Sequence, residues 1–412
     1  MTDLDVYVDI AGEPVRAGTA YFTVHRSRVS TTFTYDSAYL AGTAGDLEPG
    51  LPVSAGQQYV DGLPGAFADS SPDRWGRNLI DKRRRAAQRE ASQRLPAATA
   101  IDYLVGVSDI TRQGDLRFAD SRDPDSFLAP GRDVPKLVSL PELLNAADNV
   151  SRSDALVVGD LDAVKSLLDA GSGSLGGARP KASVRADDGR LLIAKFPHPG
   201  DEWDVMAWEK TTLDLAEAAG ITAPRRRLTR VGTRNVLLVE RFDRSGSFRV
   251  GYISAMTLLG ARDGDERDYA DIAEVLPAYG ASVKADLAEL FRRVVFNVAI
   301  HNTDDHLRNH GFLRAKGGWS LSPVFDVNPE PDVGKRRVTG IVGSSDDEPA
   351  ALLALADECR LSRGQTSALV GDVVAAVAGW RDTAQRNGIG PGEIELFADA
   401  VENGLALLGE LT

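Results

Sequence analysis

The chain has 412 residues, of which 43% are hydrophobic and 26% charged, enough for a well-buried core and for two or three domains. Its formal charge of -13 argues against a surface that binds nucleic acid throughout, although local basic patches remain possible. The single cysteine excludes an internal disulfide, and the lack of a signal peptide or of an apolar run near roughly 20 residues predicts a soluble, cytoplasmic protein.

The first part of the chain predicts a small antiparallel sheet followed by a basic helix. Apolar residues alternate over residues 4–10, and "TAYFTVHR" and "VSTTFTY" continue the β-rich pattern. The stretch "NLIDKRRRAAQREASQR" is rich in helix formers and in arginine. Such a charge run is typical of a solvated helix face, with an electrostatic contact surface as the alternative. Polar, proline-containing sequence over residues 120–141 indicates a boundary.

Helices and strands are mixed in the middle of the chain. "LPELLNAADNV" and "LDAVKSLLDAG" predict helices, and "RLLIAKFP" predicts a short strand. "EWDVMAWEKTTLDLAEAAG" has helical spacing and ends at Gly220, and "RNVLLVERFDR" is a second strand candidate. The remainder is largely helical, closing with the amphipathic "LVGDVVAAVAGW" and "EIELFADAVENGLALL".

A glycine-rich stretch, "GSGSLGGARPKASV", lies between these helices and the first strand. Its glycines match G-x-G-x-x-G, but a helix precedes it and an extended segment follows, which disfavours a dinucleotide-binding fold. A Walker A loop is excluded because Gly176 is followed by Gly177 and not by lysine. What remains is either a surface linker or a loop whose N–H groups approach phosphates. Its further donors are Ser172, Ser174, Arg179 and Lys181.

Lys195 ends the apolar strand "LLIAKFP", where its ammonium group loses hydration unless an anion meets it. Nucleotide phosphates and a helix carboxylate would supply that anion. Glu209 is the best carboxylate, with Glu202 and Asp204 as competitors. In the simpler alternative, the stem of the lysine packs while its ammonium reaches water.

The stretch "AIHNTDDHLRNHGFL" concentrates three of the five histidines with two acids and two asparagines. It could be a metal site, a phosphoryl-transfer site or a solvated turn. The phosphoryl-transfer template has an Asp, four residues, an Asn that binds magnesium and a later metal-binding Asp. Asp304, Asn309 and Asp326 follow that spacing, and Asp326 is expected on a strand edge. Glycine-rich loop, strand lysine, Asp with Asn and final Asp also come in the template's order.

Two alternatives compete with phosphoryl transfer. His301, His306 and His310 could bind zinc with Asp304 or Asp305 in a metal-dependent hydrolase, but "HNTDDH" is more typical of a turn than of a helix. We expect His301 and His306 to position the loop and His310 only to fill space. The second alternative is a catalytically silent, kinase-like co-repressor scaffold. The sequence argues against it, because every acid and base that phosphoryl transfer requires is present.

Several motifs together resemble the HipA family of serine/threonine protein kinases, the toxins of bacterial type II toxin–antitoxin systems. These motifs are "LPGAFADSSPDRWGR", "TRQGDLRF", "GSGSLGGARPKA", "LLIAKFP", "LVERFDR", "HNTDDHLRNHGFL" and "FDVNP", which span nearly the whole chain. The resemblance implies an α+β fold with an N-terminal β-rich subdomain at residues 1–135. It also implies a two-lobed kinase-like core, with the small lobe at residues 136–243 and the mostly helical large lobe at residues 244–412.

The resemblance also implies ATP and Mg²⁺ as cofactors and a role for each matching residue. Asp304 would be the catalytic acid, Asn309 and Asp326 would hold Mg²⁺, and Glu209 would pair with Lys195. The expected ATP-binding residues are Ser174, Gly176, Lys181, Lys195, Val239, Glu240, Phe242 and His306, with 239–242 forming the hinge. "FDVNP" replaces the D-F-G of better-known protein kinases, so their Phe-based switch is not transferred.

Ser174 falls where the family carries an autophosphorylated serine. Phosphate adds roughly -1.5 to -2 charge beside the ATP phosphates, so we expect autophosphorylation to weaken ATP binding. The implied partners are a HipB-like helix-turn-helix antitoxin and, through that complex, operator DNA, with co-repression of the chain's own operon. The implied substrate is a translation component such as an aminoacyl-tRNA synthetase, although no residue of the sequence identifies it. Basic stretches around Arg83 and in "PRRRLTR" could add DNA contacts.

Overall fold

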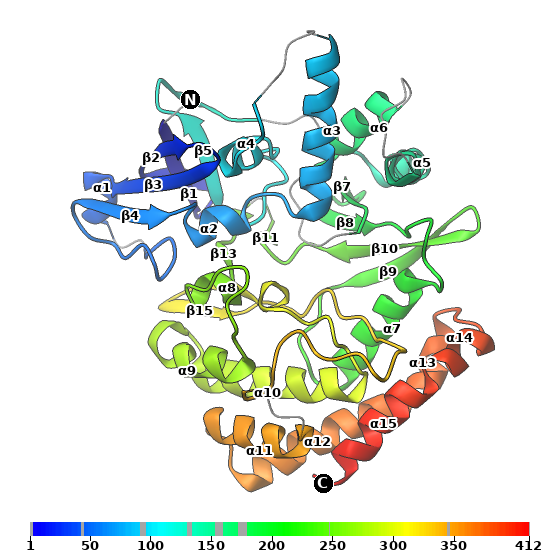
Figure 1. Cartoon of the computed structure of the whole chain (residues 1–412). Coiled ribbons are helices and arrows are strands. Elements are labelled where there is room, and N and C mark those ends of the chain that lie inside the picture. The colour runs from blue at the N-terminus through cyan, green and yellow to red at the C-terminus, as the bar shows by residue number, and fades with distance from the viewer. Residues whose placement is uncertain are drawn as a thin grey trace. The chain divides into compact units, whose positions relative to one another are not determined.

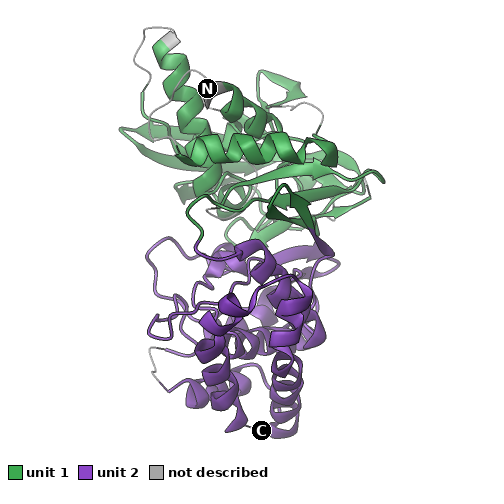
Figure 2. Ribbon diagram, turned by 90° about the vertical axis from the view of Figure 1, so that its right-hand side faces the viewer, with its two compact units in different colours: residues 1–201, 229–253 green, residues 202–228, 254–412 purple. Residues whose placement is uncertain are grey.

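The computed structural model describes residues 3–42, 45–90, 96–129, 134–152, 160–171, 179–246, 248–343 and 347–411. The chain forms two compact units, coloured separately in Figure 2: unit 1 is residues 1–201 with 229–253, and unit 2 is residues 202–228 with 254–412. Unit 1 begins with a β-rich region and unit 2 is mostly helical, so the predicted α+β class is confirmed. The domain boundaries expected after residues 135 and 243 stay a prediction.

A six-stranded antiparallel sheet forms the N-terminal part of unit 1 (Figure 1). Its strands, in the spatial order β4-β3-β2-β1-β5-β6, are β1 (Asp3–Ile10), β2 (Glu13–His25), β3 (Arg28–Tyr35), β4 (Gln57–Asp61), β5 (Leu116–Asp120) and β6 (Asp123–Phe127). The predicted alternation buries Leu4, Val6 and Val8, but Ile10 is 41% exposed because it ends the strand beside the turn. That turn consists of Ala11 and Gly12, both at positive φ (54° and 92°), which suits the twist of a two-residue hairpin.

Four helices accompany this sheet: α1 (Ser37–Leu40), α2 (Gly65–Asp69), α3 (Arg74–Glu90) and α4 (Ala100–Val105). The basic helix predicted from "NLIDKRRRAAQRE" is α3, and Arg83, Arg85 and Arg89 are exposed on it as expected. Lys82 departs from that expectation, because it is buried and donates a 2.7 Å hydrogen bond to the carbonyl of Val150. The charge run therefore includes one lysine that fastens α3 to a neighbouring helix.

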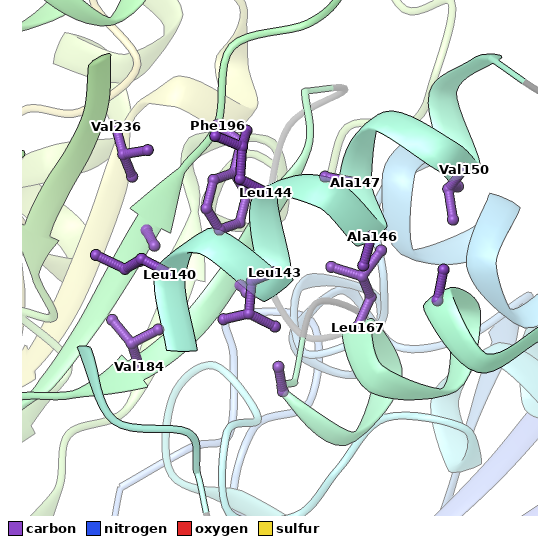
Figure 3. Packing of buried hydrophobic residues seen from close by; sticks show 14 of the residues in the cluster. Leu140, Leu143, Leu144, Ala146, Ala147, Val150, Leu167, Val184, Phe196 and Val236 are labelled. Carbon is purple, nitrogen blue, oxygen red and sulfur yellow. The ribbon is translucent and has the colours of Figure 1, made fainter. Parts of the chain in front are cut away.

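A second, four-stranded sheet has the order β7-β8-β10-β9, with strands β7 (Lys181–Arg185), β8 (Leu191–Lys195), β10 (Arg234–Glu240) and β9 (Arg226–Val231). Helices α5 (Leu140–Arg152) and α6 (Asp160–Asp169) cover one face of it. Figure 3 shows Leu140 and Leu144 of α5 beside Val184 and Phe196, within one continuous buried apolar cluster. Burial of these side chains is the main source of stability for this part of unit 1.

Unit 2 is built largely from helices. They are α7 (Val205–Ala218), α8 (Ala255–Leu258), α9 (Tyr269–Tyr279), α10 (Val283–Ala299), α11 (Glu348–Glu358), α12 (Arg363–Ala378), α13 (Trp380–Arg386), α14 (Pro391–Leu396) and α15 (Ala398–Gly409). A hairpin of β14 (Gly311–Ala315) and β15 (Gly318–Leu321) accompanies them. The side chain of Asp204 caps the start of α7. The helix ends at Ala218 with Ala219 as its C-cap residue, so the predicted terminal glycine, Gly220 (φ 79°), follows one residue later. Within the described ranges, no helix combines the length and apolarity needed to cross a membrane.

Candidate active site

Two lysines face each other across the hairpin of β7 and β8. Lys181 is the direct partner of Lys195 in the register, so both side chains lie on the same face of the sheet. Their neighbours Ala182 and Ala194 belong to the cluster under α5 and α6. Because side chains alternate along a strand, the lysines lie on the face that those helices leave uncovered.

Both ammonium groups are withdrawn from water, since Lys195 is 8% and Lys181 2% exposed. Lys181 forms a 3.3 Å ion pair with Asp73, a residue of the N-terminal motif "ADSSPDRWGR". Taking an ammonium out of water is unfavourable unless anions compensate for the lost hydration. The strand position predicted for Lys195 is confirmed, and its role in binding phosphates stays a prediction.

The segment expected to form the hinge begins inside β10. Val239 pairs with Ile193, which places its side chain on the same sheet face as Lys195. Glu240 has its carboxylate in an ion pair with Arg190, so its side chain is already engaged. Phe242 lies beyond the strand, with its ring 6.3 Å from that of Tyr252. A contact of these residues with adenine stays a prediction.

Buried charges follow the hinge segment and bind an N-terminal motif. Asp243 accepts hydrogen bonds from Arg241 (2.8 and 2.5 Å) and from Arg244 (2.9 Å). Burial opposes its ionised form, but the two guanidinium groups outweigh burial and hold the pKa of Asp243 well below its usual range. We call these three residues the Arg–Asp–Arg clamp; they occupy the start of β11 (Arg244–Ser245) and the turn before it.

The clamp holds the segment Thr111–Gly114 of "TRQGDLRF". Arg241 donates to the carbonyls of Thr111 (2.6 Å) and Arg112 (3.1 Å), and the backbone N–H of Gly114 donates to Asp243 (2.8 Å). Arg112 is itself fully buried, and burial lowers its pKa to about 9. Both motifs are visible in the sequence, but the contact between them was not predicted from it. Each motif contains opposite charges beside apolar residues, a pattern that indicates buried ion pairs.

Thr111 also touches the start of the glycine-rich stretch. Gly171 has φ 67°, and a Cβ built there would lie 2.3 Å from the Oγ1 of Thr111. A side chain at residue 171 is therefore excluded both by backbone strain and by contact. Residues 172–178, which include Ser174 and Gly176, lie outside the described part of the chain. After them, Arg179 forms a 2.6 Å ion pair with Asp201.

The loop at residues 301–310 has no regular structure until a short 3-10 turn at Leu307–Asn309, as the turn interpretation predicted. Its adjacent acids have opposite environments, since Asp304 is exposed and Asp305 only 5% exposed. The Nδ2 of Asn309 donates to the backbone carbonyl of Asp304 at 3.2 Å. That bond engages the amide nitrogen of Asn309, and the binding of a metal ion by its Oδ1 stays a prediction.

Asp305 is the centre of a buried network. Its Oδ2 lies 2.6 Å from the Tyr269 hydroxyl, 2.7 Å from Nδ2 of Asn297 and 2.7 Å from Nε2 of His310. Burial raises the pKa of Asp305, but the charge of His310 and these hydrogen bonds lower it more, so the net pKa is below its usual value. Correspondingly, burial and the Asp305 carboxylate raise the pKa of Tyr269 well above 10. The expectation that His310 only fills space is wrong, since it bonds to Asp305.

The 301–310 loop is also tied down through its backbone. Arg337 donates to the carbonyls of Asn297 (3.2 Å) and Asn302 (2.8 Å), and the N–H of Val338 donates to the carbonyl of Thr303 (2.9 Å). At the far end, the carbonyl of His310 accepts from Ala255 (2.7 Å). The loop thus has fixed ends and a fixed interior around an outward-facing Asp304.

Asp326 lies in a segment without regular structure, residues 322–330, that is hydrogen-bonded to residues at either end of this loop. Ser322 donates from its N–H to the carbonyl of Gly311 (2.8 Å), and Glu330 donates likewise to His301 (3.1 Å). Both ends of the segment are therefore bonded to the two ends of the loop. The expected strand-edge position of Asp326 is wrong, because β15 has already ended at Leu321.

The backbone at Asp326 is left-handed, with φ 58°, a conformation that is uncommon outside glycine and that asparagine and aspartate adopt more often than most residues. Such strain is concentrated at functional sites, where the surrounding contacts enforce it. One contact comes from α7, where the Thr212 hydroxyl donates to the carbonyl of Val327 at 2.5 Å. Thr212 lies one turn after Glu209, which is 2% exposed. The ion pair of Glu209 with Lys195 stays a prediction.

His301 and His310 bind different groups. Nε2 of His301 lies 3.1 Å from the carbonyl of Asp332, whereas Nε2 of His310 lies against Asp305. Across the ranges that the structure describes, no cluster of three or more His, Cys, Asp or Glu side chains could hold a metal ion. The zinc-hydrolase alternative therefore loses its proposed ligands. A role of His306 in binding ATP stays a prediction.

Comparison with known proteins gives two matching family models, the "HipA-like C-terminal domain" at residues 173–380 and the "HipA N-terminal domain" at residues 15–101. The HipA chain of a Shewanella oneidensis complex of HipA, HipB and operator DNA has the same fold. Its TM-score is 0.69 at 15% identity, over 99% of this chain and 97% of that one.

A Haemophilus influenzae protein named "Putative kinase" is 24% identical over 189 residues, which are 39% of this chain and 54% of that protein. The present chain thus spans about half the length of this relative. The C-terminal family model alone covers about half of the chain, the N-terminal model adds a separate region, and the motifs that they match include the lysine strand and the Asp304 loop. The chain belongs to the HipA family.

Proposed function

We propose that this chain is an ATP- and Mg²⁺-dependent serine/threonine protein kinase that acts as the toxin of a toxin–antitoxin pair. The observation that carries the proposal is the 301–310 loop, which presents one carboxylate, Asp304, to solvent and fixes Asn309 five residues later by a bond to the carbonyl of Asp304. A kinase needs an accessible carboxylate for the substrate hydroxyl and an amide oxygen for the metal at this spacing.

In the proposed reaction, the γ-phosphoryl group of ATP passes to a serine or threonine hydroxyl of the substrate and ADP leaves. Asp304 orients that hydroxyl and accepts its proton, for which an exposed carboxylate is suited. The Oδ1 of Asn309 and the carboxylate of Asp326 are the hard oxygen ligands that Mg²⁺ prefers, so these residues fit the ion. When bound, Mg²⁺ neutralises charge that develops on the transferring phosphoryl group.

Unit 1 would supply the groups that hold the nucleotide. Lys195 is proposed to bind the α- and β-phosphates, assisted by Lys181 from the same sheet face. Backbone groups of the 239–242 segment are proposed to contact adenine, because the Glu240 side chain is engaged by Arg190. Ser174 and Gly176 of the glycine-rich loop, and His306, complete the proposed ATP-binding residues.

Regulation and partners are proposed from family membership. Autophosphorylation at Ser174 would place a dianion beside the ATP phosphates and so limit the kinase's own activity. By analogy with the Shewanella complex, the partners are a HipB-like helix-turn-helix antitoxin and operator DNA. The proposed substrate class is a translation component such as an aminoacyl-tRNA synthetase.

The test is incubation of the full chain with ATP and Mg²⁺, alone and with a bacterial lysate, followed by mass mapping of phosphorylated sites. We expect phosphate on Ser174 and on a small set of lysate proteins, and neither with Asp304→Asn. The variant should keep the wild-type melting temperature, because Asp304 is exposed and its carbonyl, not its carboxylate, holds Asn309. Phosphorylation by Asp304→Asn at the wild-type rate would refute the proposed role of this residue.

A further inference from the structure

The second acid of "TDDH" has a different task from the first. Asp305 is buried, while Asp304, its neighbour in the chain, is exposed. Asp305 is therefore screened from a substrate hydroxyl, and its Oδ2 is occupied by Tyr269, Asn297 and His310. A carboxylate so engaged cannot serve as the base for a substrate, but it can fix the position of the residue beside it.

We propose that Asp305 is a positioning residue that sets the location of Asp304 by anchoring the loop to two helices at once. Tyr269 is the first residue of α9 and Asn297 belongs to the last turn of α10, so one carboxylate oxygen ties the loop to both. His310, at the C-terminal end of the loop, bonds to the same carboxylate oxygen. This inference rests on the proposed kinase function and concerns the same site.

The geometry explains why a displacement of Asp305 would slow the proposed phosphoryl transfer. Consecutive Cα atoms are about 3.8 Å apart, so a shift of the Asp305 backbone moves Asp304 by nearly the same amount. Asn309 would move as well, because its side chain is bonded to the carbonyl of Asp304. A misplacement of about 1 Å at a reacting group can slow a reaction about 10²-fold.

A second layer of bonds supports the anchor. Asn297 accepts on its Oδ1 from the side chain of Asn302 at 3.1 Å, and the N–H of Asn302 donates to the carbonyl of Asn297 at 2.9 Å. The rings of Tyr269 and His310 meet edge to face at 5.5 Å. The donors around Asp305 are thus themselves held in place, which a positioning role requires.

The experiment measures kcat and KM for ATP, with each kcat normalised to the fraction of protein that binds Mg²⁺-ATP by calorimetry. That normalisation removes the contribution of unfolded molecules. For Asp305→Asn we expect kcat per binding-competent molecule to fall about 10²-fold, with a smaller rise in KM for ATP because Asn309 is displaced together with Asp304. Tyr269→Phe, which removes one of the three partners, should give an intermediate fall and add little to the effect of Asp305→Asn.

Asp286→Asn is the matched control. Asp286 is also a buried acid of unit 2, 7% exposed, but its hydrogen bond comes from the backbone N–H of Leu321, at the end of β15. It should leave kcat unchanged. The inference is overturned if Asp305→Asn retains kcat within twofold, or if Asp286→Asn loses as much activity.

Two further outcomes are also decisive. If Asp305→Asn does not fold, Tyr269→Phe decides, because wild-type kcat in that variant overturns the inference. A wild-type chain without ATP turnover refutes the proposed function and the inference with it. An active wild type beside an equally active Asp305→Asn refutes only the inference.

Discussion

Replacing Asp243 by asparagine should destabilise unit 1 strongly. The substitution removes the carboxylate charge that pairs with both Arg241 and Arg244, whose side chains are 1% and 9% exposed, and weakens the bond from Gly114. Removing one partner of a buried ion pair lowers the free energy of unfolding by about 3–5 kcal/mol, because the other charge stays buried without compensation. For a domain of the size of unit 1, about 2–4 °C per kcal/mol predicts a fall in Tm of roughly 6–20 °C.

The pH dependence gives this prediction a second, independent check. The pKa of Asp243 in the folded chain lies well below its ordinary value of 3.8, because the charges of the two arginines outweigh burial. Its contribution to stability is therefore complete above about pH 3.8 and is lost as the pH falls through the folded pKa. The difference in Tm between wild type and Asp243→Asn should be constant near pH 7 and should narrow below pH 3.8.

Thermal melting followed by circular dichroism across this pH range is the assay. Asp120→Asn is the matched control, because Asp120 also pairs with an arginine two residues away, but Arg122 is 80% exposed in its side chain. That variant should melt like wild type. If both variants melt alike, or if the Tm difference for Asp243→Asn persists unchanged below pH 3.8, the reasoning about the buried clamp is refuted.

Three further predictions concern single positions. Burial raises the pKa of Glu48 from 4.5 to about 7, so the folded chain holds a proton that the unfolded chain releases, and stability falls as the pH rises from 4.5 to 7. Glu48→Gln should remove this fall, by up to about 3 kcal/mol, in a series of melts at different pH. Gly114→Ala should cost about 1–2 kcal/mol in denaturant titrations, since φ is 76° and the new Cβ would lie 3.2 Å from the backbone N of Tyr252. Asp326→Asn should keep the wild-type Tm because asparagine tolerates φ 58°, whereas Asp326→Ala should lose about 1 kcal/mol, and calorimetry should show weaker Mg²⁺-ATP binding for both.

Local pattern predicted much of the fold. Alternation indicated β1, β2 and β3, and apolar spacing with a terminal glycine indicated α7, because each depends on residues within one element. Pairing between distant strands was not predictable in this way. β1 bonds to β5, so that Val6 lies opposite Phe118, and no local signal links two strands so far apart in the chain.

The candidate site shows the same division. The spacing of Asp304 and Asn309 identified the loop, since five residues of sequence separation are visible without a structure. The same spacing selects Asp304 over Asp305, but the residues alone do not predict which of the two adjacent aspartates faces solvent. In the structure, Asp305 is the aspartate held in the interior, because Tyr269 and Asn297 from two different helices donate hydrogen bonds to its carboxylate.

The hairpin of β7 and β8 has a consequence for how this protein tolerates insertions. Its alternate residues either enter the apolar cluster under α5 or carry the ammonium groups of Lys181 and Lys195. Shifting one strand by a single residue exchanges the two sets, which would drive a charge into the cluster and expose alanines. A one-residue insertion near Ala186–Arg190 therefore threatens stability and ligand binding together. Insertions of two residues, which keep every side chain of both strands on its original face of the sheet, should be far better tolerated.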